Sequence, residues 1–236
     1  MINNSGEDFV LFKGKKIEVK NGELYLPDEL ERFDEIERLE KLTNLKKLYY
    51  DGIPLRKIEH LDHLKNLESL ILQGSRYIKI ENLDNLTNLR ILNLEDSNIA
   101  EIENLQNLRN LEVLSLRRPY EMGENYITEI KGLDNLSNLK QLWLGHNKIT
   151  EIKGLDPLIN LEILSLSYNQ ITEIKGLANL VKLEELYLDH NIITEIEDLD
   201  NLVNLKYLSI EGNGPFNSNS INALESMKKR GIYVLL

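Results

Sequence analysis

Leucine and isoleucine recur with a fixed period of 22 residues through most of the chain. The leucines that open successive units are Leu45, Leu67, Leu89, Leu111, Leu139, Leu161, Leu183 and Leu205. Every step is 22 residues except the one after Leu111, which is 28 residues and therefore contains six extra residues. Within a unit, the apolar positions are 1, 4, 6, 11, 14, 17 and 20. Such self-similarity predicts a repeat architecture in which each unit is one small supersecondary structure.

The order of apolar residues within a unit predicts its elements. The run Leu-x-x-Leu-x-Leu alternates over its last three letters, which is typical of a short strand. After a turn, apolar residues follow three apart, which is the spacing of a tight 3₁₀ or helical turn. One such coil cannot bury its own leucines, whereas stacked coils bury them in one continuous core. The pattern predicts an α/β solenoid with a parallel sheet on one side and short 3₁₀ or α turns on the other.

Two positions in the turns of each unit, 9 and 16, are mostly occupied by polar residues or glycine, and we interpret both rows as structural. A buried asparagine at position 9 can satisfy backbone groups and build a ladder from coil to coil. Position 16 is rich in residue types that tolerate left-handed backbone angles. Position 9 holds Ile53, Ser75, Ser97, Asn125, Asn147, Asn169, Asn191 and Asn213. Position 16 holds His60, Asn82, Asn104, Gly132, Gly154, Gly176 and Asp198.

The repeats occupy residues 45–212, and we expect caps at 1–44 and 213–236 because terminal coils need covering. In the first cap, residues 16–26 suggest a β-hairpin closed at Asn21-Gly22 by a type I′ turn. A short helix should follow around Leu30 and merge into the first coil. In the second cap, INALESMKKR reads as a helix with Ser218 or Ser220 as its N-cap, followed by the strand IYVLL.

The amino-acid composition limits the classes of partner that we expect and leaves the predicted fold unchanged. The 236 residues carry 28 Lys and Arg against 39 Asp and Glu, a net charge of −11. An acidic surface opposes nucleic-acid backbones and anionic membranes, so we expect neither as a partner. There is no cysteine, which excludes disulfides and thiolate zinc sites. The apolar run Phe9–Phe12 is too short for the core of a signal peptide, and we expect a cytoplasmic monomer.

The unit LDNLSNLKQLWLGHNKITEIKG, residues 133–154, resembles the 22-residue class of leucine-rich repeats. In particular it resembles the Sds22-like group, which includes phosphatase-regulating Sds22 proteins and the repeat domains of bacterial internalins. The resemblance spans roughly residues 36–213. It implies a right-handed leucine-rich repeat superhelix whose parallel strands line a concave, protein-binding face. It also implies possible partner classes: a phosphatase catalytic subunit or small GTPase for the first group, and a host receptor for the second.

Positions 3 and 5 flank the buried leucine at position 4, so their side chains should face outward from the sheet. Each predicted strand carries one bulky apolar or aromatic residue at one of these positions. Together they form a band: Tyr49, Ile71, Ile91, Val113, Trp143, Ile163, Tyr187 and Tyr207. Strand propensity alone would also place isoleucine and valine there. For Tyr49, Trp143 and Tyr187 we favour partner binding, because aromatic residues are the usual anchors of interfaces.

A second row, at positions 7 and 8, runs beside the band and contains Arg117, Arg118, His146, Tyr168 and His190. The six-residue insertion is drawn from residues 117–124, at the rim of the concave face. It should bring Tyr120 and both arginines beside Trp143. Our hypothesis is that loop and band bind one acidic or mixed partner surface, so deleting residues 118–123 should weaken binding. The alternative is a tolerated surface insertion, because lengthening a loop costs little.

The sequence offers little catalytic chemistry. His146 and His190 are two coils apart, about 10 Å for strands spaced at 4.8 Å, with Tyr168 between them, so a shared metal is not expected. Neither a phosphate-binding glycine loop nor a paired nucleophile and base is apparent. We therefore predict a non-catalytic, cofactor-free interaction scaffold that binds a folded protein on its concave face. The alternative is a secreted or cell-surface adhesion module of the internalin type.

Overall fold

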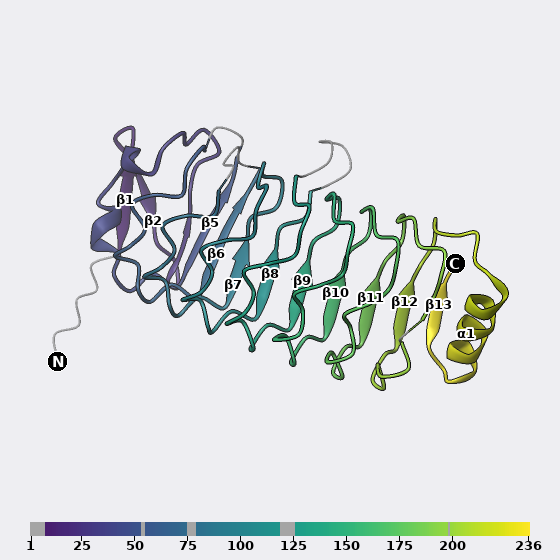
Figure 1. The fold of residues 1–236 in the computed structure, drawn as a ribbon. Coiled ribbons are helices and arrows are strands. Elements are labelled where there is room, and N and C mark those ends of the chain that lie inside the picture. The colour runs from purple at the N-terminus through teal and green to yellow at the C-terminus, as the bar shows by residue number, and fades with distance from the viewer. Residues whose placement is uncertain (1–7, 53–54, 75–78, 119–125, 198) are drawn as a thin grey trace.

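The chain forms an elongated stack of coils with one long sheet along its side (Figure 1). The computed structural model describes residues 8–52, 55–74, 79–118, 126–197 and 199–236. Ten strands pair in the order β13-β12-β11-β10-β9-β8-β7-β6-β5-β3, and every neighbouring pair is parallel. The predicted leucine-rich repeat solenoid is confirmed.

One strand comes from each coil, and neighbouring coils are in register. The strands are β3 (Glu23–Tyr25), β5 (Lys47–Asp51), β6 (Ser69–Gln73), β7 (Ile91–Asn93), β8 (Val113–Ser115), β9 (Gln141–Trp143), β10 (Ile163–Ser165), β11 (Glu185–Tyr187), β12 (Tyr207–Ser209) and β13 (Tyr233–Leu235). Position 4 leucines pair along the stack, for example Leu164 with Leu142 and Leu186. Positions 3 and 5 therefore also align from coil to coil. We call the outward side of this sheet the concave face.

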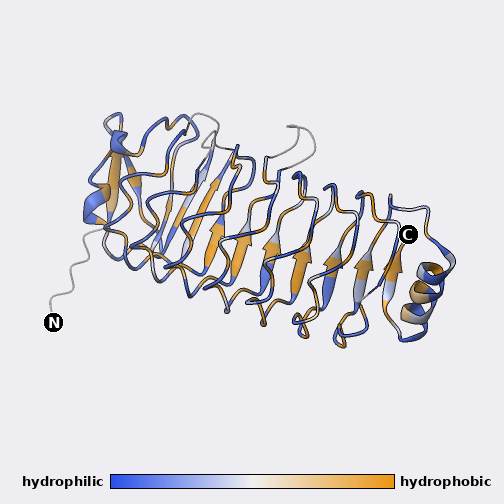
Figure 2. Cartoon of the chain, viewed as in Figure 1, coloured by the Kyte–Doolittle hydropathy of each residue, from blue (hydrophilic) through white to orange (hydrophobic). Residues whose placement is uncertain are grey.

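The repeated leucines and isoleucines fill one continuous core. Hydrophobic residues recur from coil to coil along the stack (Figure 2). In the unit that starts at Leu161, all seven apolar positions are at most 3% exposed. The first complete unit has Tyr50 at position 6, where the ring is 1% exposed and its hydroxyl donates to the Leu30 carbonyl over 2.9 Å. Burial raises the pKa of Tyr50 to about 12, because the charged phenolate would be poorly solvated there.

The asparagines at position 9 join neighbouring coils as predicted. The Asn169 amide oxygen accepts the Ile149 N–H over 3.0 Å. Its amide nitrogen donates to the carbonyls of Leu144 and Leu166, at 3.0 and 2.9 Å. Asn147, Asn191 and Asn213 repeat this arrangement, while Asn125 lies outside the described residues. The ladder satisfies backbone groups that the bend away from each strand leaves unpaired.

Position 16 adopts the predicted left-handed conformation wherever it is described. The φ angles run from 59° to 73° at His60, Asn82, Asn104, Gly132, Gly154 and Gly176. At Gly154, an added Cβ would lie 2.6 Å from the Ile130 carbonyl oxygen, so backbone approach as well as φ favours glycine there.

The N-terminal cap differs from the predicted hairpin over residues 16–26. The hairpin is instead formed by β1 (Phe9–Phe12) and β2 (Lys15–Glu18), and β4 (Ile36–Glu37) pairs with β1. The expected turn at Asn21-Gly22 is formed, with positive φ angles at both residues and an antiparallel bridge between Lys20 and Glu23. The chain does not continue as a hairpin, because β3 leaves to pair in parallel with β5. The reason is that Leu24, fully buried, takes position 4 of an additional coil.

Short 3₁₀ turns replace the helix expected near Leu30: η1 (Phe33–Glu35) and η2 (Leu39–Lys41). The C-terminal cap contains the expected helix, α1 (Ser218–Lys229), and β13 extends the sheet. The N-cap prediction was wrong: Asn217 caps α1 by accepting the Ser220 N–H, while the Ser220 hydroxyl accepts the Ile196 N–H. Within the described residues, α1 and the 3₁₀ turns are too short and polar to span a membrane.

Candidate protein-binding face

The eight band residues all lie on the concave face. Some neighbours in the band are directly opposite each other on adjacent strands, and others are offset because one is at position 3 and the next at position 5. Tyr49 is in register with Ile71, and Ile91 with Val113. Seven of the eight are half-buried, and Ile91 is 37% exposed. Each side chain thus keeps an accessible surface while its inner edge packs on neighbours. The band is a continuous strip of the kind that usually marks a partner site.

The N-terminal end of the band contains an aromatic pair. The rings of Tyr25 and Tyr49 stack with centroids 4.4 Å apart and planes 5° apart. Tyr25 is 60% exposed and was missed by the sequence reading, which placed it in a hairpin. Its context, Glu-Leu-Tyr-Leu, matches positions 3 to 6 of a repeat and could have revealed it.

The C-terminal end of the band holds four aromatic residues, which we call the C-terminal aromatic cluster: Trp143, Tyr187, Tyr207 and Tyr233. Their ring centroids are separated successively by 6.2, 5.1 and 5.5 Å. Trp143 and Tyr187 approach across β10 because the intervening residue is the small Ser165, which is only 7% exposed. Tyr233 is 63% exposed and was also missed, because its strand was read only as a lid.

The polar tips of the aromatic residues are held by their neighbours at position 3. The Tyr187 hydroxyl donates to Glu185 over 2.7 Å, and the Trp143 indole N–H points at the Gln141 amide oxygen at 3.4 Å. Burial, followed by the bond to Glu185, raises the pKa of Tyr187 to about 12. The hydrogen bond to Glu185 holds the Tyr187 ring in one orientation before any partner arrives.

Three residues at position 8 form a ring stack on the rim. Tyr168 lies between His146 and His190, with centroids 4.2 and 4.3 Å away. All three have φ between 52° and 56°, which turns their side chains to the same side. Burial lowers the pKa of His146, and nearby Asp189 opposes this. Over the described ranges, no three His, Asp or Glu side chains group as metal ligands would.

The two predicted rim arginines are engaged by the preceding coil. Arg117 Nε lies 2.9 Å from a Glu95 oxygen that also accepts the Ser115 hydroxyl over 2.6 Å. Arg118 donates to the Asn98 side-chain oxygen over 3.1 Å. These contacts reduce the positive charge available to an acidic partner. Tyr120 and the rest of segment 119–125 lie outside the described residues.

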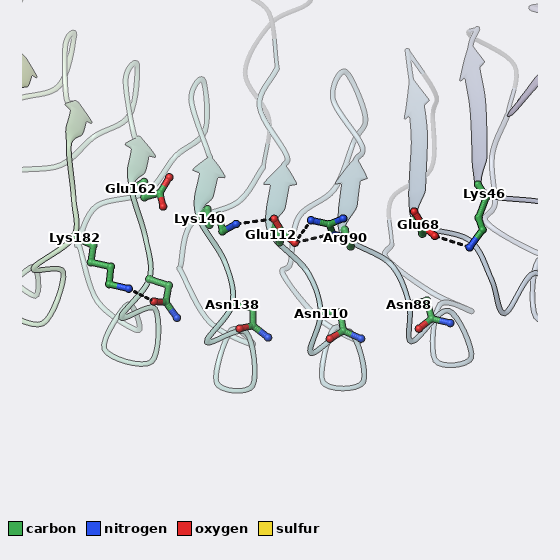
Figure 3. A pocket seen from close by; sticks show the side chains of 11 residues that line it. Lys46, Glu68, Asn88, Arg90, Asn110, Glu112, Asn138, Lys140, Glu162 and Lys182 are labelled. Carbon is green, nitrogen blue, oxygen red and sulfur yellow. Dashed lines mark hydrogen bonds and ion pairs between the residues drawn. The ribbon is translucent and has the colours of Figure 1, made fainter. Parts of the chain in front are cut away.

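A polar groove along the start of the strands was also missed (Figure 3). Its volume is about 690 Å³. Position 2 carries charges that alternate along much of the stack: Lys46 pairs with Glu68 at 2.5 Å, and Glu112 with both Arg90 and Lys140. Those two cations lower the pKa of Glu112, Lys140 first. Reading position 2 as a row would have revealed the alternation. Because most of these charges are paired internally, we interpret them as coil-to-coil bonds.

Comparison with known proteins agrees with this geometry. The family model described as Leucine Rich repeats (2 copies) matches residues 121–157 and 159–201. The search of curated proteins found no match. Together with the sheet and core, the family match makes the chain a leucine-rich repeat protein by fold, and such solenoids commonly present an extended concave face for binding.

Three solved structures are similar over 84% of this chain. Internalin C2 of Listeria monocytogenes has 28% identity and a TM-score of 0.72, with 83% of that chain covered. The internalin inlF of the same organism has 27% identity and a TM-score of 0.70. A Leptospira interrogans leucine-rich repeat protein has 27% identity and a TM-score of 0.65. The chain spans only 55% and 56% of the latter two.

Proposed function

We propose that the protein is a non-catalytic interaction module that binds a folded protein on its concave face. The observation that carries this proposal is the band, extended to ten residues by Tyr25 and Tyr233, which leaves apolar surface accessible from β3 to β13. Large aromatic side chains are common energetic anchors of protein interfaces. Their orientation by Glu185 and Gln141 lowers the ordering cost of binding.

A protein is a better fit to this surface than a nucleic acid. The net charge of −11 would repel a phosphate backbone. A strip that crosses ten strands is also longer than a small ligand needs. The resemblance to Sds22-like repeats suggests a phosphatase catalytic subunit or a small GTPase as the partner, with a cytoplasmic location.

A secreted or cell-surface adhesion module is the second candidate function. The two Listeria internalins, 27% and 28% identical over 84% of this chain, favour it. Fractionation of source cells separates the candidates, since the adhesion module requires the protein at the surface or in the medium.

The test is affinity capture from source-cell lysate and from isolated surface fractions. A Tyr49→Ala, Trp143→Ala, Tyr187→Ala variant should lose the partner that the wild type retains. The matched control is Ile159→Ala, Val181→Ala, Val203→Ala, which removes three side chains that are 52%, 46% and 69% exposed at position 21, off the sheet. Equal capture by the band variant and the wild type would contradict the proposal, provided that both unfold cooperatively.

A further inference from the structure

We propose that the C-terminal aromatic cluster is a subsite for arginine side chains, and that the partner presents a basic, arginine-bearing surface to it. The inference rests on the function proposed above and specifies the chemistry of its partner. It follows from how aromatic faces, carboxylates and cations are distributed along the concave face.

The aromatic rings offer accessible faces for a planar cation. Tyr207 and Tyr233 lie with planes 12° apart and centroids 5.5 Å apart, and Tyr233 is 63% exposed. A guanidinium group is planar and weakly hydrated, so it stacks on aromatic faces more readily than a compact ammonium group does. The negative face of a tyrosine or tryptophan ring adds electrostatic attraction for the cation.

Three carboxylates, Glu185, Asp189 and Glu211, belong to the two coils that carry Tyr187 and Tyr207. Glu185 is in register with Tyr207, and it accepts the Tyr187 hydroxyl with one of its two oxygens. Asp189 and Glu211 occupy position 7 of the same two coils, and Asp189 accepts the Ser167 hydroxyl over 2.6 Å. A carboxylate matches the paired donors of a guanidinium group.

Two cations at positions 3 and 7 of the described coils, Lys47 near the N-terminal end and Arg117 on the coil before that of Trp143, are already paired. Lys47 bonds to Glu23 over 2.8 Å, and Arg117 to Glu95 over 2.9 Å. In the part of the chain that the structure describes, no lysine or arginine forms an ion pair with Glu185, Asp189 or Glu211. The aromatic end therefore has three negative charges that a basic partner surface would complement.

Trp143 makes this inference directly measurable, because it is the only tryptophan of the chain and belongs to the cluster. The probes are hexa-arginine and hexa-lysine amides, titrated into the full chain while Trp143 fluorescence is recorded. We expect hexa-arginine to bind at least about fivefold more tightly than hexa-lysine, because only arginine combines stacking with bidentate bonds. Changing Tyr207→Leu and Tyr233→Leu should bring the two affinities together without altering net charge.

Charge is tested separately. Glu185→Gln, Asp189→Asn, Glu211→Gln should weaken hexa-arginine binding about tenfold or more. Glu101→Gln, Glu151→Gln, Glu173→Gln is the matched control. It removes three carboxylates that are at least 59% exposed, at position 13 and away from the cluster, and should weaken binding less than about twofold. Cooperative thermal unfolding verifies that each variant is folded.

Equal affinity for both peptides in the wild type, or equal weakening by the two charge variants, would overturn the arginine subsite. That result would leave the proposed function standing if the band variant still failed to capture its partner. Conversely, unchanged capture by the band variant would overturn the proposed function even if hexa-arginine bound as expected.

Discussion

The imidazole of His146 lies flat on the ring of Tyr168, with centroids 4.2 Å apart and planes inclined by 10°. His190 covers the opposite side of the same ring at 4.3 Å. The His190 ring in turn lies over Gly212, where an added Cβ would be 2.5 Å from Nδ1. The rim of the concave face thus contains a packed column that spans three coils and ends on a fourth.

Acid should destabilise this column. Burial lowers the pKa of His146, so the folded state favours the neutral ring. The contribution is therefore present above the unfolded pKa, near 6.5, and is lost as pH falls towards the folded pKa. We expect the free energy of unfolding, measured by urea denaturation, to fall less between pH 7 and pH 5 in a His146→Asn variant than in the wild type.

His60→Asn is the control for that experiment. His60 also has a left-handed φ, of 61°, and asparagine tolerates that conformation. A difference in pH dependence of the same size in both variants would show that the packing of His146 on Tyr168 is not the cause.

Removing one side chain of the position 9 ladder should be costly. Asn169→Ala would leave the Ile149 N–H and the carbonyls of Leu144 and Leu166 without the bonds described above. We expect a loss of about 2 to 4 kcal/mol in the free energy of unfolding, because the Ile149 N–H would remain unsatisfied and the two carbonyls would each lose one of their donors. Asn147 and Asn191 would still donate to Leu144 and Leu166, respectively. Asn204→Ala removes one exposed bond to the Val181 carbonyl and should cost less than about 1 kcal/mol. Similar losses in the two variants would contradict the structural role of the ladder.

Two glycine substitutions separate backbone strain from crowding. Gly14 and Gly154 have nearly equal φ angles, 74° and 71°. A Cβ at Gly14 would meet nothing within 4 Å, whereas one at Gly154 would lie 2.6 Å from the Ile130 carbonyl oxygen. Gly14→Ala should cost about 1 kcal/mol, and Gly154→Ala about 2 to 4 kcal/mol. Chemical denaturation measures both, and equal costs would exclude crowding at Gly154.

Alkaline pH should act through Tyr50. Its pKa is raised from 10.0 to about 12, so the folded state retains the phenol proton more tightly than the unfolded state does. The stabilisation is present below pH 10 and is lost as pH rises from 10 towards 12. A Tyr50→Phe variant should lose less stability than the wild type over this range, as measured by thermal unfolding. Parallel decline in both proteins would assign the effect to other groups.

Most of the solenoid could be predicted because the core residues recur in the sequence with a fixed period. Leu161, Leu164 and Leu166 must face inward for any coil to bury its apolar side chains, which fixes the outward direction of Ile163 and Ser165. The same logic placed all eight band residues on one face. The position 9 asparagines were predictable because one short amide can satisfy donors and acceptors together.

The ends were harder to predict, because local and long-range pairing competed there. Asn21-Gly22 is a strong local turn signal, yet Leu24 gains more by entering the core than by extending a hairpin. Tyr25 and Tyr233 were missed for the same reason: each belongs to a coil that departs from the 22-residue pattern. The pairing of Arg117 with Glu95 depends on side-chain direction between coils, which spacing alone does not give.

The in-register stack also sets the distance between sites on the sheet in fixed steps, one step for each coil. The Tyr25–Tyr49 pair and the C-terminal aromatic cluster are separated by a whole number of coils, and neighbouring strands are spaced about 4.8 Å apart. Removing one complete unit, such as residues 89–110, would shorten that separation by one step and leave the residues of both groups unchanged. Selection can therefore tune the distance between the two anchoring points by duplicating or deleting units, independently of the chemistry at either point.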